Sequence, residues 1–139
     1  MATLLEDIRK GADWTVRAFA ELGRNLDYSL ESLKDIDLFF DGQTENGEVK
    51  PGGLLEKNFG YKIFAIASYV GETLIKNCPG SKWLTNDNDP QGEINIAVKL
   101  GNGHMVWPGQ KVFKRFKNGK EDSLYGYVCM VLGRVRRIM

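Results

Sequence analysis

The residues that could do chemistry in this 139-residue sequence are few, and His104 is the only histidine among them. A Ser-His-Asp triad, a Cys-His pair or a histidine-containing zinc site would therefore have to use it. His104 directly follows Gly101-Asn102-Gly103, and Asn-Gly between apolar segments is typical of a hairpin turn. We expect His104 to flank an exposed turn, and we predict no catalytic, cofactor-binding or metal-binding residues.

Glu72 is the carboxylate that most resembles a catalytic group, because it lies beside Gly71 in the middle of a predicted helix. Lys76 follows four residues later, and a Glu-to-Lys pair in this order stabilises a helix by roughly a few tenths of a kcal/mol. We favour this structural role, in which Gly71 allows a neighbouring element to approach closely. A carboxylate-based enzyme that uses Glu72 near residues 42–53 is retained as a third hypothesis.

Two further acidic residues, Asp87 and Asp89, resemble part of a calcium-binding loop. The other acidic positions and the trailing glutamate that such a loop requires are missing. We expect both side chains to cap turns, because Asp accepts hydrogen bonds from the backbone N–H groups that follow it.

Cysteine content and the N-terminus bear on the compartment. Only Cys78 and Cys129 are present, whereas a secreted domain of this size usually has about four or more cysteines. Glu6 and Asp7 stand where a signal peptide has basic residues. No apolar stretch reaches the length of about 18 residues that crosses a bilayer. We therefore predict reduced thiols in a cytoplasmic protein with no membrane partner.

The composition predicts an ordinary globular domain. Hydrophobic residues make up 42% of the chain and charged residues 27%, which argues against disorder. With 19 basic and 18 acidic residues, the formal net charge is +1 at pH 7. The overall charge therefore gives no simple reason to expect a nucleic-acid-binding or membrane-binding protein.

Basic residues are nevertheless concentrated near the C-terminus. Residues 101–139 contain eight Lys or Arg and two acidic residues, a net charge of +6, which leaves −5 on residues 1–100. Such a surface suits an anionic partner, either RNA or an acidic protein. Alternatively, the lysines form the solvated face of an amphipathic helix and the arginines oppose a helix dipole. The candidate partner-binding residues are Trp107, Lys111, Lys114, Arg115, Lys117, Arg134, Arg136 and Arg137.

The elements that must position these residues begin with two helices. Thr3 and Glu6 form a capping box at the start of the first helix, and Gly23 is suited to end it. Apolar residues at helical spacing predict a second helix over about residues 27–40. Residues 42–53 contain one apolar side chain among twelve, so we predict a mobile loop that could act as a lid.

A long central helix is predicted next, because a continuous apolar stripe runs over residues 54–77. Alternating residues then predict strands, and Pro108 in a first-turn position marks the start of another helix. The predicted elements after the central helix are strands over 82–85, 93–100 and 104–107, a helix over 108–118 and a final helix from about 121.

The register of the last predicted hairpin depends on its turn. A two-residue turn at Asn102-Gly103 pairs Leu100 with Met105 and places Trp107 on the apolar face. A three-residue loop would instead pair Leu100 with His104 and turn Trp107 outward. We favour the two-residue turn because it buries more apolar surface, and we therefore expect Trp107 to be buried.

Together these elements predict a single α+β domain over residues 1–139. Their order is ααα-βββ-αα, with a three-stranded antiparallel meander packed against the long central helix. Residues 1–41 form the N-terminal helical pair, 42–53 the loop, and 54–139 the central helix, the sheet and the C-terminal helices. Trp83 is expected to be buried between the sheet and the central helix.

A series of short motifs runs through residues 54–139 and is distinctive in combination. The motifs are Gly71-Glu72, Pro79-Gly80, Trp83, Leu100-Gly101-Asn102-Gly103, Pro108, Val112, Lys114-Arg115 and the run Asn118-Gly119-Lys120-Glu121-Asp122-Ser123-Leu124. They resemble a family of small bacterial proteins that is known only as a domain of unknown function. The resemblance implies a bacterial α+β protein and supplies no catalytic residues.

The leading hypothesis for function is a non-enzymatic protein-interaction module of the adaptor or immunity type. It rests on the lack of a catalytic constellation or cofactor motif in the sequence and on the balanced charge. The alternative is nucleic-acid binding through the basic C-terminal face. The third hypothesis is the carboxylate-based enzyme near Glu72 and residues 42–53.

Overall fold

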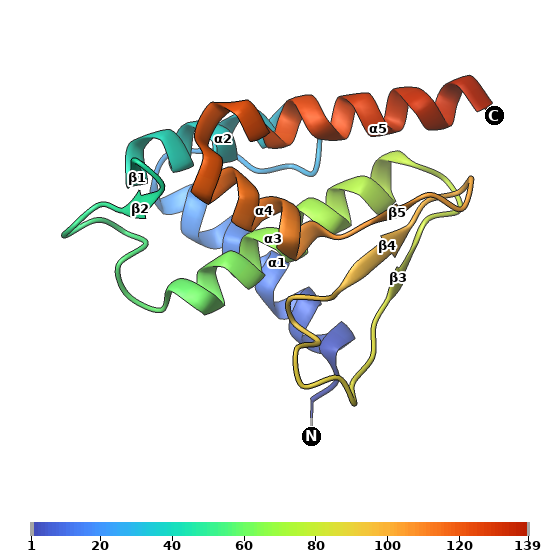
Figure 1. Ribbon diagram of the computed structural model, residues 1–139, viewed down its shortest axis with the longest axis horizontal. Helices are drawn as coiled ribbons and strands as arrows, with labels where there is room; N and C mark the ends of the chain where they lie inside the picture. The colour runs from blue at the N-terminus through green and yellow to red at the C-terminus, as the bar shows by residue number, and fades with distance from the viewer. Residues whose placement is uncertain (1, 139) are drawn as a thin grey trace.

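The computed structural model describes the backbone of residues 2–138 and the side chains of residues 2–133 (Figure 1). The chain mixes α-helices with short antiparallel strands, as predicted. The elements are α1 (Leu4–Glu21), α2 (Ser32–Gln43), β1 (Thr44–Glu45), β2 (Glu48–Val49), α3 (Phe59–Asn77), β3 (Lys82–Leu84), β4 (Ala97–Lys99), β5 (Met105–Val106), α4 (Pro108–Asn118), the 3-10 helix η1 (Gly119–Asp122) and α5 (Leu124–Ile138). Within residues 2–138, no helix is long and apolar enough to cross a membrane.

The start of α1 is held by two side chains. The Thr3 hydroxyl accepts a hydrogen bond from the Glu6 N–H at 3.2 Å, which confirms the predicted cap. The Leu4 N–H donates to Oδ1 of Asp87 at 2.8 Å. The loop that follows β3 is therefore tied to the N-terminus of the first helix.

Helix α2 begins five residues later than predicted, because residues 27–31 form a turn anchored on α3. Tyr28 has a positive φ of 64°, and its backbone N–H donates to the Tyr69 hydroxyl at 2.8 Å. The two tyrosine rings stack with centroids 4.7 Å apart. Asp27 accepts from the Ser29 N–H, a local bond that competes with helix formation.

Residues 42–53 contain a hairpin that the sequence prediction missed. Strands β1 and β2 pair antiparallel, Thr44 with Val49 and Glu45 with Glu48. Asn46 and Gly47 between them both have positive φ, which is the geometry of a type I′ turn. The predicted order ααα-βββ-αα is therefore wrong, because this additional hairpin lies between α2 and α3.

Helix α3 is the central element, and it starts at Phe59 rather than at residue 54. Almost every residue from Ile63 to Leu74 is buried. Helix α1 packs closely against it, since a Cβ at Gly11 would lie only 3.1 Å from the Cα of Ala65. Figure 1 shows α4 crossing in front of α3, and α5 running along the top of the view.

The second sheet has the strand order β3-β4-β5, and both pairs are antiparallel. Val98 pairs with Val106, and the Leu100 N–H donates to the His104 carbonyl at 2.8 Å. A three-residue loop therefore connects the strands, and the predicted two-residue register is wrong. Gly103 supplies the positive φ of 90° that this loop needs at its last position.

The predicted strand over 93–100 is also too long. Only Ala97–Lys99 are strand, and residues 89–95 form turns. Asp89 accepts hydrogen bonds from the Gln91 N–H and the Asn95 side chain, which hold the turn conformation in place of strand pairing. Ile94 consequently points to solvent.

The sheet meets the central helix through Trp83 and Gly71. A Cβ at Gly71 would lie 2.0 Å from Cη2 of Trp83, so only glycine admits the indole here. The predicted close approach at Gly71 is confirmed, although Trp83 is half-buried rather than buried. The prediction that Trp107 is buried is wrong, because the observed register turns its side chain outward with 43% of its surface exposed.

Candidate interaction surface on helix α4

Helix α4 joins the core to an exposed surface that carries three of the eight predicted partner-binding residues. Pro108 occupies its first turn, as predicted, since proline lacks the N–H that would be unbonded there. Val112 and Phe116 are buried on its inner face. The outer face is bordered by two grooves, one on each side of a ridge formed by Gln110 and Lys114.

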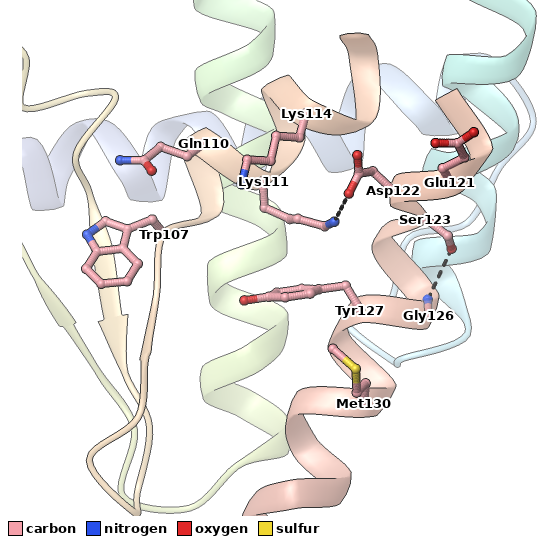
Figure 2. A pocket seen from close by; sticks show the side chains of 10 residues that line it. All are labelled: Trp107, Gln110, Lys111, Lys114, Glu121, Asp122, Ser123, Gly126, Tyr127 and Met130. Carbon is pink, nitrogen blue, oxygen red and sulfur yellow. Dashed lines mark hydrogen bonds and ion pairs between the residues drawn. The ribbon is translucent and has the colours of Figure 1, made fainter. Parts of the chain in front are cut away.

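The first groove lies between α4 and α5, and we call it the α4–α5 groove (Figure 2). Its volume is about 550 Å³. Trp107 borders it at the start of α4 and Met130 on α5, with 43% and 48% of their surfaces exposed. The lining residues are Trp107, Gln110, Lys111, Lys114, Glu121, Asp122, Ser123, Gly126, Tyr127 and Met130.

Lys111 is fixed inside the α4–α5 groove. Its Nζ lies 2.8 Å from Oδ1 of Asp122 and 4.7 Å from the centroid of the Tyr127 ring. Hydrogen bonds from Lys111 and then from Asn118 hold the pKa of Asp122 below its ordinary value. Lys111 thus links α4 to the start of α5, and its charge is already balanced.

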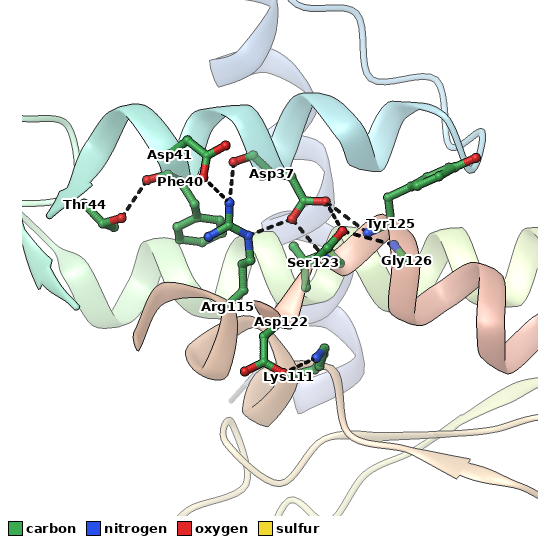
Figure 3. Close-up of polar contacts among 11 residues, drawn as sticks. Asp37, Phe40, Asp41, Thr44, Lys111, Arg115, Asp122, Ser123, Tyr125 and Gly126 are labelled. Atoms are coloured by element: carbon green, nitrogen blue, oxygen red, sulfur yellow. Dashed lines mark hydrogen bonds and ion pairs between the residues drawn. The ribbon is translucent and has the colours of Figure 1, made fainter. Parts of the chain in front are cut away.

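Arg115 does not lie on the solvated face of α4, although the sequence predicts a place for it there. Only 1% of its surface is exposed, and its guanidinium is directed towards α2 (Figure 3). Nε lies 2.8 Å from Oδ1 of Asp37, and Nη2 lies 2.6 Å from Oδ1 of Asp41. Two carboxylates therefore balance this buried cation, and it is not available to a partner.

The Asp37 carboxylate also caps the start of α5. It accepts hydrogen bonds from the backbone N–H groups of Leu124 and Tyr125 and from the Ser123 hydroxyl, at 2.9, 3.1 and 2.9 Å. An anion at this position opposes the positive end of the helix dipole. A single side chain on α2 thus fixes both α4, through Arg115, and α5.

The other predicted basic residues are spread over different surroundings. Lys117 donates from Nζ to the Gly47 carbonyl at 3.2 Å, next to the β1–β2 hairpin. Lys114 is exposed and takes part in no ion pair among the described residues. The side chains of three candidates at the end of α5 lie outside the described residues, namely Arg134, Arg136 and Arg137. The structure therefore brings together Trp107, Lys111 and Lys114.

The second groove, which we call the α3–α4 groove, was missed by sequence reasoning. It has a volume of about 620 Å³ and a mostly apolar lining. Phe113 and Ile94 form its two exposed walls, with 44% and 57% of their surfaces accessible. The lining residues are Gly60, Ile63, Phe64, Glu93, Ile94, Gly109, Gln110, Phe113 and Lys114. The incorrect strand assignment at residues 93–96 concealed the position of Ile94.

The remaining candidate residues do not converge on either groove. His104 is exposed at the hairpin end, as predicted. Asp89 caps a turn through the Gln91 N–H, as predicted, whereas the prediction for Asp87 is wrong, because its carboxylate accepts from the Leu4 N–H at the start of α1. Cys78 is buried, Cys129 is half-buried, and both are free thiols.

Glu72 and residues 42–53 lie apart. Glu72 is on the C-terminal half of α3. The pKa of Tyr28 is raised by burial of the tyrosine and then by the charges of Asp13 and Glu72. The β1–β2 hairpin lies at the other end of α3, beside the last turn of α4 (Figure 1). The predicted Glu72–Lys76 ion pair is not formed, since Lys76 Nζ lies over the Tyr28 ring at 4.7 Å.

Among the described residues, no group of three or more His, Cys, Asp or Glu side chains could hold a metal ion. Comparison with protein families, with curated proteins and with solved structures finds no match to this chain. The resemblance of residues 54–139 to a bacterial family of unknown function therefore stays a prediction.

Proposed function

We propose that this protein is a non-enzymatic protein-interaction module that binds a partner through the α4–α5 groove. The observation that carries the proposal is the exposure of Trp107 and Met130 on the two sides of this groove, at 43% and 48%. Tryptophan and methionine are among the residues enriched at protein interfaces, and tryptophan is common among those that dominate binding energy.

The polar groups of the groove support binding rather than proton transfer. Lys111 and Asp122 are hydrogen-bonded to each other, and this bond lowers the pKa of Asp122, which makes its carboxylate a weaker proton acceptor. These fixed groups line the same groove as the exposed indole and thioether, so the groove offers a partner both polar and apolar contacts. An apolar side chain of the partner is expected between Trp107 and Met130.

Nucleic-acid binding is the second candidate, and one observation favours it. The exposed indole of Trp107 lies in the same groove as Lys114, so a base could stack beside a cation that contacts a phosphate. Arg115 and Lys111 weaken this candidate, because both are engaged in ion pairs. Binding to a single-stranded RNA at about 50 mM salt, where counterion release favours association, distinguishes the two candidates.

Photo-cross-linking in a lysate of the source organism tests the leading proposal. Benzoylphenylalanine at position 130 is expected to capture one protein reproducibly, and adding Trp107→Ala is expected to abolish the capture. The matched control is the same photoreactive residue at position 22, because Leu22 is also exposed but lies outside both grooves. Equal capture at positions 130 and 22, or no capture at 130, would contradict the proposal.

The free thiols of Cys78 and Cys129 support a reducing compartment, and we place the module in the cytoplasm on that basis.

A further inference from the structure

We infer that a pocket between α1 and α3, which we call the α1–α3 pocket, binds a small uncharged molecule with two fused aromatic rings. The inference goes beyond the proposed function, because no residue that lines this pocket also lines the α4–α5 groove. Helix α1 contributes Trp14, Ala18 and Phe19 to the lining, and α3 contributes Lys62 and Ile66.

The lining suits an aromatic ligand, because it is mostly apolar and contains three aromatic side chains. The rings of Phe19 and Phe39 lie with their centroids 5.0 Å apart. The Trp14 ring meets the Tyr61 ring edge-on, with the centroids 5.6 Å apart and the planes at 78°. Aromatic rings attract one another in such tilted and edge-to-face arrangements beyond the effect of buried area. An aromatic ligand therefore gains contacts here that a saturated ligand of the same size lacks.

The volume of the α1–α3 pocket sets the size of the ligand. The pocket has a volume of about 210 Å³. An apolar cavity of about 150 Å³ holds one benzene ring. The additional volume accommodates a second fused ring, whereas molecules of ordinary drug size occupy pockets of about 300–1,000 Å³.

The two charged residues of the lining favour a ligand without net charge. Glu21 and Lys62 both line the α1–α3 pocket and have opposite signs. A ligand with a net charge would be attracted by one of them and repelled by the other. Lys62 is in addition engaged, because its Nζ donates a hydrogen bond to the Leu54 carbonyl.

The walls of the α1–α3 pocket are held in place without a ligand. The Leu54 N–H donates to Oε1 of Gln43 at 2.7 Å, and the Leu54 carbonyl accepts from Lys62, so the backbone of this lining residue is fixed on both sides. Phe39 and Ile66 belong to the hydrophobic core, with 9% and 1% of their surfaces exposed. Binding therefore orders few protein groups, which lowers its entropic cost.

Isothermal titration calorimetry of the full chain with 2-naphthol tests the inference. This probe has two fused aromatic rings and is uncharged at pH 7. One molecule is expected to bind per chain, with a dissociation constant of about 0.1–1 mM for a ligand of this size. Decahydro-2-naphthol, the saturated analogue, is expected to bind at least about threefold more weakly, because it lacks the ring contacts. A chain that binds neither compound, or binds both equally well, would overturn the inference.

The variant Ala18→Leu locates the binding site. Ala18 lines the α1–α3 pocket, so a leucine at this position occupies part of its volume and is expected to weaken 2-naphthol binding by about tenfold or more. Leucine forms helix nearly as well as alanine, so the thermal midpoint should change little.

Ala20→Leu is the matched control, because it makes the same change at an exposed position of α1 outside the pocket. It should leave the affinity for 2-naphthol within about twofold of wild type. Binding that survives Ala18→Leu, or that Ala20→Leu weakens to the same extent, would overturn the inference. Neither result affects the proposed function, which depends on Trp107 in a separate groove.

Discussion

Nε of Arg115 on α4 lies 2.8 Å from Oδ1 of Asp37 on α2, and the same carboxylate accepts the first backbone N–H groups of α5 (Figure 3). The two helices that border the α4–α5 groove are therefore aligned by one side chain that lies outside the groove. Burying the guanidinium without its carboxylates would carry a large desolvation cost. The guanidinium therefore stays against the carboxylates of α2 once that helix is in place. The geometry of the proposed binding groove depends on this pair.

The first prediction concerns that pair. Asp37→Asn removes one of the two carboxylates that balance Arg115 and weakens the cap of α5, and it is expected to lower the free energy of unfolding by about 2–4 kcal/mol. Urea denaturation measures the loss. Asp35→Asn is the matched control, because its ion pair with Arg24 at 3.1 Å is about one third exposed and should contribute less than about 1 kcal/mol. Equal losses of unfolding free energy in the two variants would show that the buried ion pair stabilises the protein no more than the exposed one does.

The second prediction concerns the contact between Gly71 and Trp83. Gly71→Ala places a methyl group where Cη2 of Trp83 lies, and the displaced indole is expected to cost about 1–3 kcal/mol despite the better helix propensity of alanine. Gly42→Ala is the control, because a Cβ at this helical glycine meets nothing within 4 Å and should stabilise by up to about 1 kcal/mol. Thermal unfolding of both variants should show midpoints that move in opposite directions, and a rise in both would contradict this prediction.

The third prediction concerns pH. The pKa of Asp122 lies below its ordinary value of 3.8 in the folded chain, chiefly because Lys111 donates a hydrogen bond to it. A carboxyl group whose pKa is lower in the folded chain stabilises the protein at every pH above its ordinary pKa. This stabilisation is lost as the pH falls through the lowered pKa. Wild type should therefore unfold less readily than Lys111→Met at pH 7, and the difference should shrink below about pH 4. A difference in unfolding free energy that stays constant down to pH 2 would mean that the Lys111–Asp122 bond has no linkage to folding.

Sequence reasoning found the features that depend on neighbours along the chain. The Thr3 cap, the start of α4 at Pro108 and the glycine at position 71 each have a local signature, and the structure confirms all three. The hairpin at Asn46-Gly47 was missed because its flanking strands are mostly polar and show no alternation.

The features that sequence reasoning missed depend on distant residues. Arg115 and Asp37 are separated by 78 positions, and the only local clue was the spacing of Asp37 and Asp41 at adjacent turns of one helix. The register of the β4–β5 hairpin failed for a related reason. Gly101-Asn102-Gly103 permits both turn lengths, and the choice depends on burying Val106 rather than Trp107.

The central claim is that the α4–α5 groove binds a protein partner, and isothermal titration calorimetry with the purified captured partner tests it most directly. Trp107→Ala is expected to weaken binding by about tenfold or more, because an exposed tryptophan beside a groove is typical of the residues that dominate an interface. Leu22→Ala, which removes a similarly exposed side chain outside the groove, should leave the affinity within about twofold. An affinity that Trp107→Ala leaves unchanged, or that Leu22→Ala reduces to the same extent, would contradict the account.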